Sequence, residues 1–125
     1  IKKGSNTIIL DAYNANPSSM KAALTNFNDL KTDNKIVFLG DMFELGKAAK
    51  TEHETIADFA DSLKVENIVL IGENFHNTTY ASHRVLKFKS FENFTEGFDF
   101  SKLKEATILI KGSRGMAMER LLEFI

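Results

Sequence analysis

Four short apolar runs rich in β-branched residues constrain the fold of this chain more than any other feature. They occupy residues 7–10, 36–39, 67–71 and 107–110. Apolar runs of this length, without regular polar alternation, are typical of strands that are buried on both faces of a parallel sheet. The sequence therefore predicts four buried strands, spread over nearly the whole chain.

Two stretches with helical spacing of apolar residues separate the first three runs. The first has one apolar face at Met20, Ala23, Leu24 and Phe27, and the second has one at Ile56, Ala57, Phe59, Ala60 and Leu63. Strands that alternate with helices of this length are typical of right-handed βαβ units. The sequence therefore predicts an α/β fold, a Rossmann-like three-layer domain with a mostly parallel sheet covered by helices on both faces.

The rest of the chain has weaker patterns. We expect an additional edge strand at 85–88 and a last helix from about Gly115. The segment 90–105 has the poorest pattern, and its phenylalanines are expected to pin irregular or short helical structure onto the core. The chain has 125 residues, of which 43% are hydrophobic, and this is enough to fill one core. We therefore expect a single domain over residues 1–125.

Composition excludes several classes of function. The net charge is -1, so no basic surface is available for nucleic acid or anionic lipid, and we expect neither as a partner. There is no cysteine, no signal sequence and no apolar run long enough for a membrane helix, so we expect a cytoplasmic protein. His53, His76 and His83 lie far apart without acidic neighbours at ligand spacing, and we expect no metal site. His53 is expected on a helix surface, where it could orient the loop after residues 36–39.

In a parallel sheet, ligands bind beyond the carboxyl ends of the strands, where loops lead into helices. In the first such loop, Asn16 and Pro17 predict a helix start, with Asn16 as the N-cap. Asp11 at the strand end is well placed to accept hydrogen bonds from ribose hydroxyls, and Tyr13 and Asn14 could line a base or phosphate. From the residues alone, a purely structural alternative remains open. In it, Asp11 only caps backbone groups and Tyr13 only packs against its neighbours.

The second loop, residues 40–47, is not a phosphate-binding P-loop. Five residues separate its glycines where a P-loop has four, and Ala48 follows the lysine where a P-loop has Ser or Thr. Asp41 and Glu44 make the loop acidic, which repels phosphate and suits a substrate that carries an amine. For Glu44, the alternative that it lies in a solvated loop and binds no ligand remains open.

The third loop, residues 111–115, has the opposite charge. Its glycines allow a ligand to approach the backbone, Lys111 and Arg114 are cationic, and Ser113 can cap the following helix. A carboxylate or phosphate would fit there. The spacing of the two glycines also occurs in the RNA-binding loop of KH domains, but that loop joins two helices, whereas this one follows a strand.

Three segments together resemble one family. DAYNANPSSM at 11–20, GDMFELG at 40–46 and KGSRGMAMERLL at 111–122 are similar to the C-terminal domain of the Mur ligases, in the form that adds D-alanyl-D-alanine to a peptidoglycan precursor. The resemblance implies that Asp11, Tyr13, Asn14 and Asn16 face a nucleotide, and that Asp41, Glu44, Lys111, Ser113 and Arg114 face the substrates. It places all three loops on one rim of the molecule.

The resemblance also implies a reaction and its components. The substrates would be ATP, D-alanyl-D-alanine and UDP-N-acetylmuramoyl-tripeptide, with ATP and Mg²⁺ held mainly by a central domain that this chain lacks. The chain would close over the ATP site of its own monomeric ligase and position the dipeptide, and would be inactive alone. Two alternatives remain open: an independent Rossmann-like nucleotide-binding domain, although the expected Gly-rich turn is missing, and a non-catalytic protein-docking module.

Overall fold

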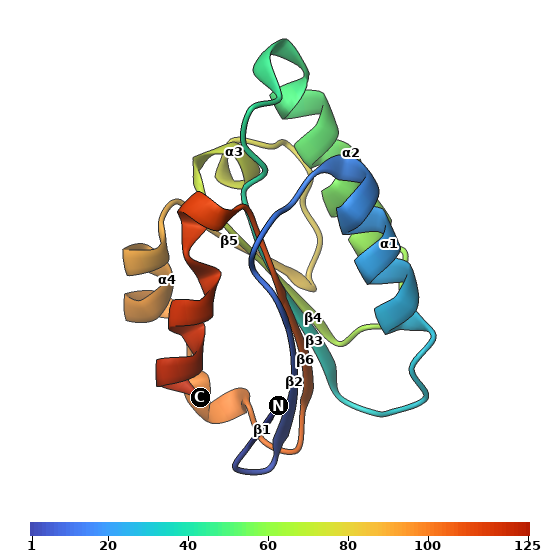
Figure 1. Ribbon diagram of the computed structural model, residues 1–125, viewed down its shortest axis with the longest axis vertical. Helices are drawn as coiled ribbons and strands as arrows, with labels where there is room; N and C mark the ends of the chain where they lie inside the picture. The colour runs from blue at the N-terminus through green and yellow to red at the C-terminus, as the bar shows by residue number, and fades with distance from the viewer.

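The four apolar runs form the centre of a six-stranded sheet in the computed structural model, which describes residues 1–125 (Figure 1). The strands are β1 (Lys2–Lys3), β2 (Asn6–Asp11), β3 (Lys35–Gly40), β4 (Asn67–Ile71), β5 (Val85–Phe88) and β6 (Thr107–Lys111). Their order across the sheet is β1-β2-β6-β3-β4-β5. Only β1 is antiparallel to its neighbour, and all other pairs are parallel. The expected edge strand at 85–88 is therefore confirmed.

Helices cover both faces of this sheet, as Figure 1 shows. The α-helices are α1 (Pro17–Asn28), α2 (Ala49–Asp61), α3 (Glu73–His76) and α4 (Phe91–Gly97), and the 3₁₀ helices are η1 (Gly46–Ala48), η2 (Phe100–Lys102), η3 (Arg114–Met116) and η4 (Met118–Phe124). Helices α1, α2 and α3 pack on one face, and α4 and η4 pack on the other. The predicted Rossmann-like three-layer architecture is confirmed. No helix is both long and apolar enough to cross a bilayer.

Each face of the sheet has its own hydrophobic cluster, because successive residues of a strand point to opposite sides. In β3, Val37 and Leu39 pack towards α1 and α2, whereas Ile36 and Phe38 pack towards α4 and η4. The Phe38 ring meets the edge of the Phe94 ring with centroids 5.6 Å apart. Full burial of one such side chain stabilises the fold by roughly 1.5–3 kcal/mol. The phenylalanines of 90–105 do pin short helices onto the core, as expected.

The start of α1 follows the sequence prediction closely. Asn16 is the N-cap residue, and its side-chain oxygen accepts a hydrogen bond from the Ser19 N–H at 2.9 Å. The Ser19 hydroxyl oxygen accepts in return from the Asn16 N–H, and Pro17 occupies the first turn. This reciprocal cap fixes the point where the loop after β2 ends.

The expected last helix is not an α-helix. Ala117 has a left-handed backbone (φ 48°, ψ 49°), and it divides the segment into the 3₁₀ helices η3 and η4. The Arg120 guanidinium donates to the carbonyl oxygens of Met116 and Ala117 at 2.7 and 2.9 Å, which stabilises this bend. Apolar residues recur along this segment, but periodicity alone does not distinguish a 3₁₀ helix from an α-helix.

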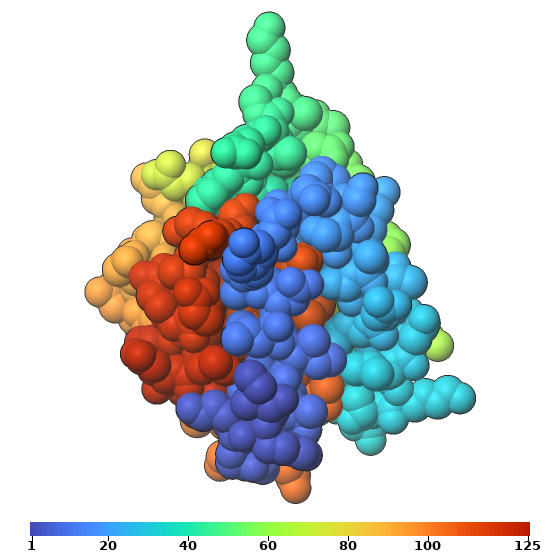
Figure 2. All heavy atoms as spheres, viewed as in Figure 1, coloured from blue at the N-terminus to red at the C-terminus, as the bar shows by residue number.

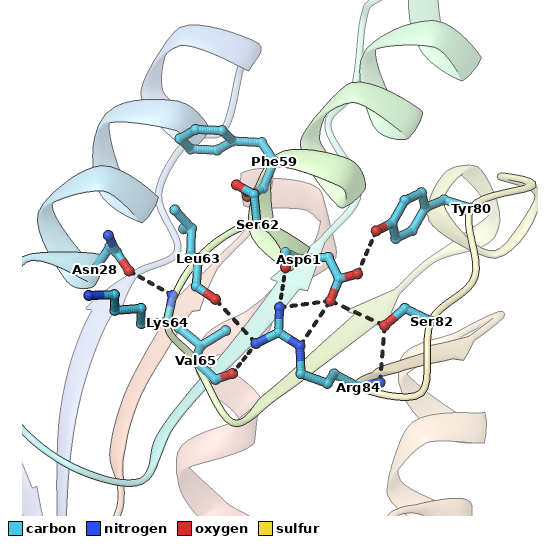
Figure 3. A network of polar contacts seen from close by, with 10 residues as sticks. All are labelled: Asn28, Phe59, Asp61, Ser62, Leu63, Lys64, Val65, Tyr80, Ser82 and Arg84. Carbon is cyan, nitrogen blue, oxygen red and sulfur yellow. Dashed lines mark hydrogen bonds and ion pairs between the residues drawn. The ribbon is translucent and has the colours of Figure 1, made fainter.

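A polar network fixes the end of α2 to the segment before β5 (Figure 3). Arg84 forms an ion pair with Asp61 at 2.9 Å and donates to the backbone carbonyls of Leu63 and Val65. Burial alone would raise the pKa of Asp61, but hydrogen bonds from Tyr80, Ser82 and Arg84 outweigh it and hold that pKa below its ordinary value. The network lies on the side of the molecule away from the three loops and fixes the turn into β4.

Candidate functional site

The loops that follow β2, β6 and β3 converge, because these strands are neighbours in the sheet and their carboxyl ends meet at one edge. Figure 2 shows the blue segment after β2 lying against the orange-red segment after β6, with the green loop after β3 beside them. Contacts between side chains and backbone connect all three loops. The expected common rim therefore exists in this fold.

Lys111 and Asp11 form the first of these connections. They are register partners at the ends of β6 and β2, and Lys111 Nζ lies 2.8 Å from Asp11 Oδ2. Lys111 Nζ also donates to the Asn14 carbonyl at 2.9 Å. The Lys111 side chain is 2% exposed and the Asp11 side chain is 47% exposed. Lys111 therefore holds the loop from beneath, while Asp11 keeps its second oxygen free at the surface.

Ser113 forms the second connection, between the loops after β6 and β3. Its hydroxyl oxygen accepts a hydrogen bond from the Phe43 N–H at 2.9 Å, and its own N–H donates to the Asp41 carbonyl at 3.1 Å. The buried Ser113 side chain makes no cap for η3, so the expected capping role is wrong. A hydroxyl that accepts from a neighbouring loop is a long-range contact, which local sequence rules do not reveal.

Asp41 is buried, and its carboxylate faces α3. Its two oxygens accept the N–H groups of Asn74 and Phe75 at 2.8 and 3.0 Å. Burial raises the pKa of Asp41, and the two backbone hydrogen bonds oppose this shift. Gly72 makes room for the carboxylate, since a Cβ at Gly72, where φ is +129°, would lie 2.3 Å from Asp41 Cγ. The suggested role of Asp41 at an amine stays a prediction, but both of its oxygens already have partners.

The remaining predicted residues lie at the surface of the rim. Arg114 and Tyr13 are exposed, and the guanidinium carbon lies 5.3 Å from the centre of the tyrosine ring. Glu44 and Asn14 are exposed as well, and with Arg114 they border a small cleft of about 200 Å³. The side-chain oxygen of Asn16 is engaged in the α1 cap. The cleft thus has one acidic wall and one cationic wall.

His53 was misjudged from the sequence. It is fully buried rather than on a helix surface, and its ring lies edge-on to Phe75. Nε2 accepts a hydrogen bond from the Met42 N–H at 3.0 Å, and Nδ1 lies 2.6 Å from the Ala49 carbonyl oxygen. A signal was present, because His53 lies three, four and seven residues before the buried Ile56, Ala57 and Ala60 and so shares their face of α2.

A larger cleft of about 590 Å³ lies on the other side of Phe43, beyond the ends of β4 and β5. Its charged and amide lining includes the predicted residue Asp41 together with Glu73, Asn74, Lys89, Glu92 and Arg120. Both acidic and basic groups line this cleft. Phe43 and Gly115 border both clefts, and a Cβ at Gly115 would lie 2.8 Å from the Phe43 ring.

The chemistry of the rim is that of binding and orientation. It offers a half-exposed carboxylate at Asp11, a cation at Arg114 stacked on Tyr13, and a carboxylate at Glu44. Lys111 and Ser113 hold together the loops that carry these groups. No group of three histidine, aspartate or glutamate side chains comes close enough together to hold a metal ion. The exposed groups of the rim are thus hydrogen-bonding and charged groups, of the kind that can orient a ligand.

Comparisons with known proteins agree with this geometry. The UDP-N-acetylmuramoyl-tripeptide–D-alanyl-D-alanine ligase of Rickettsia prowazekii is 32% identical over an alignment 124 residues long, and the alignment covers 94% of this chain and 27% of that protein. A crystal structure of MurF from Acinetobacter baumannii matches 99% of this chain and 29% of its own, with a TM-score of 0.87 and 28% identity. MurF ligase from Thermotoga maritima, in complex with ADP, shares the fold at 22% identity, with a TM-score of 0.75 over 98% of this chain and 28% of its own.

The chain thus spans little more than a quarter of the length of the relatives that it matches. A family model, described as the glutamate ligase domain of Mur ligases, matches residues 1–114. The match includes the loops after β2 and β3 and reaches Arg114 in the third loop. The chain therefore belongs to the Mur ligase, glutamate ligase domain family.

Proposed function

We propose that residues 1–125 are the C-terminal domain of an ATP-dependent ligase that adds D-alanyl-D-alanine to UDP-N-acetylmuramoyl-tripeptide. The observation that carries this proposal is the junction of the loops after β2, β3 and β6 at one sheet edge. The printed names of three relatives, each 32–34% identical to this chain, support the choice of reaction. An N-terminal and a central ATPase domain would supply the remaining parts of a monomeric, cytoplasmic enzyme.

The nucleotide would meet the loop after β2. Lys111 holds Asp11 so that its second oxygen can accept hydrogen bonds from ribose hydroxyls, and the exposed ring of Tyr13 can cover a base. Asn14 lies in the same loop, whereas Asn16 would act by fixing the loop through its cap. This chain offers no Gly-rich cradle for phosphates, so ATP and Mg²⁺ would be held mainly by the central domain.

The same loop argues against an independent dinucleotide-binding domain. Such domains leave the first N–H groups of the helix free for a diphosphate behind a Gly-rich turn. Here the Asn16 side chain already occupies the Ser19 N–H, and the turn contains no glycine. A nucleotide contact by Asp11 at the sugar, with the phosphates held elsewhere, fits this geometry better.

The dipeptide would lie in the cleft between Glu44 and Arg114. The guanidinium can pair with its carboxylate and the Glu44 carboxylate can receive its amine, while Lys111 and Ser113 hold the two walls. Asp41 would contribute by fixing its loop. ATP, when bound, activates the acceptor carboxylate. Orientation of the amine by these walls can lower the barrier by several kcal/mol, since ideally oriented reactants gain roughly 7–11 kcal/mol.

A kinetic comparison in the complete ligase carrying this domain tests the proposal. Arg114→Ala should raise the KM for D-alanyl-D-alanine about tenfold or more, which corresponds to the loss of one charged hydrogen bond of roughly 1.5–3 kcal/mol. Arg114→Lys should recover part of the loss. Lys104→Ala, an exposed cation after η2 at the opposite end of the strands, is the matched control and should change nothing. Equal increases of this KM in Lys104→Ala and Arg114→Ala would contradict the proposal.

The isolated chain gives a second test. Because the phosphate cradle would lie in the central domain, the 125-residue protein should not hydrolyse ATP at a measurable rate. Phosphate release can be followed with magnesium and ATP present, with and without D-alanyl-D-alanine. Sustained release by the purified chain would show that it is a complete ATPase and would overturn the proposed division of labour.

A further inference from the structure

The bonding of His53 defines its protonation state. The Met42 N–H points at Nε2, so Nε2 must be an unprotonated acceptor. The Ala49 carbonyl oxygen lies 2.6 Å from Nδ1, so Nδ1 must carry the hydrogen and donate it. The ring is therefore neutral, with both nitrogens satisfied and no access to solvent.

The surroundings of the ring come from three elements. From the end of β3, the Asp41 carboxylate lies 3.9 Å from Nε2 and is the charged group that faces the ring. From α3 the neighbour is the uncharged ring of Phe75, and from α2 it is the Ala49 carbonyl. A proton added to Nε2 would face the Met42 N–H hydrogen and remove its acceptor, while the Asp41 carboxylate would attract the charged ring.

The Met42 N–H is the middle point of a clamped segment. On one side, the Asp41 carbonyl accepts from the Ser113 N–H, and on the other side, the Phe43 N–H donates to the Ser113 hydroxyl. The Asp41 carboxylate is also bound to α3, and His53 adds an anchor from α2 at the one N–H between the two Ser113 contacts. Without it, a buried N–H would have no partner, at a cost of roughly 1–3 kcal/mol.

We propose that His53 is a positioning residue, whose neutral ring fixes residues 41–43 and thereby sets where Phe43 and Glu44 stand beside Arg114. This inference rests on the proposed function, since it assigns the clamped segment to the dipeptide cleft. His53 does not border either cleft, so it acts only through the loop. The exposed His76 and His83 have no such role.

Two substitutions separate positioning from packing. His53→Phe keeps a ring against Phe75 but removes the acceptor, whereas His53→Gln removes the ring but places an amide oxygen within reach of the Met42 N–H. Hydrogen exchange of the 125-residue chain should show Met42 protection reduced about tenfold or more by phenylalanine and largely kept by glutamine. Protection in the β3–β4 ladder serves as the control for folding.

The complete ligase gives the functional readout. His53→Phe should raise the KM for D-alanyl-D-alanine about tenfold and leave the KM for ATP within about twofold. In His53→Gln the KM for D-alanyl-D-alanine should return close to the wild-type value. Equal losses in both variants, or full Met42 protection in the phenylalanine variant, would overturn the inference. A wild-type ligase that fails to join the dipeptide would refute the proposed function instead, and the exchange comparison would still decide whether His53 holds the loop.

Discussion

The pair formed by Lys111 and Asp11 should respond asymmetrically to substitution, because its two charges differ in burial. The Lys111 side chain is 2% exposed and the Asp11 side chain is 47% exposed. Asp11→Asn leaves a buried ammonium without a counter-charge. Breaking a buried pair in this way costs about 3 kcal/mol, at the low end of the usual range because the asparagine oxygen can still accept from Nζ.

The reverse substitution should cost less. Lys111→Met leaves a carboxylate that is half exposed and can be hydrated again, and methionine fills the same narrow space. The expected loss is about 1–2 kcal/mol. The double variant buries no charge, so it should be close to Lys111→Met and more stable than Asp11→Asn alone.

Urea denaturation followed by circular dichroism measures all three variants. The midpoints should fall in the order wild type, Lys111→Met together with the double variant, then Asp11→Asn, with unchanged dependence on urea concentration. Equal losses in the two single variants, or additive losses in the double variant, would refute the assignment of Lys111 as a buried charge that depends on Asp11.

Two further predictions concern stability. Gly72→Ala should destabilise the fold by more than about 2 kcal/mol, because a Cβ there collides with Asp41, whereas Gly4→Ala, at a positive φ in open space, should cost about 1 kcal/mol; equal urea midpoints would contradict this. The hydrogen bond to Asp61 raises the pKa of Tyr80 from 10.0 to about 12, so its stabilisation is complete below pH 10 and is lost as pH rises towards 12. Tyr80→Phe should flatten this alkaline decline in thermal melts, and an unchanged decline would contradict it.

The sequence predicted the strands and the two long helices because each has a local signal. Apolar runs marked β2, β3, β4 and β6, and Asn16 with Pro17 marked the start of α1. The short elements β1 and α3 contain too few residues to show a periodic pattern of apolar residues. The 3₁₀ geometry of η4 depends on the left-handed backbone of Ala117. Alanine rarely adopts this conformation, so the sequence does not predict it.

The convergence of the three loops was expected from the sequence, but the directions of individual side chains were not. In the structure β2, β6 and β3 are neighbours, and this order places Asp11, Arg114 and Glu44 on one rim. The directions of Asp41 and Ser113 depend on partners more than 30 residues away in the chain, so no local pattern could supply them. His53 carried a helical-spacing signal that its polar character obscured.

Ligands of this domain are expected to approach the edge of the sheet where the three loops meet. Amide shifts of the isotope-labelled 125-residue chain, recorded while D-alanyl-D-alanine and then magnesium with ATP are added, test it most directly. We expect weak, saturable shifts confined to residues 11–16, 40–46 and 111–115. Shifts centred on the opposite end of the strands, at residues 29–34 and 102–106, would contradict it, and so would no shift with either ligand.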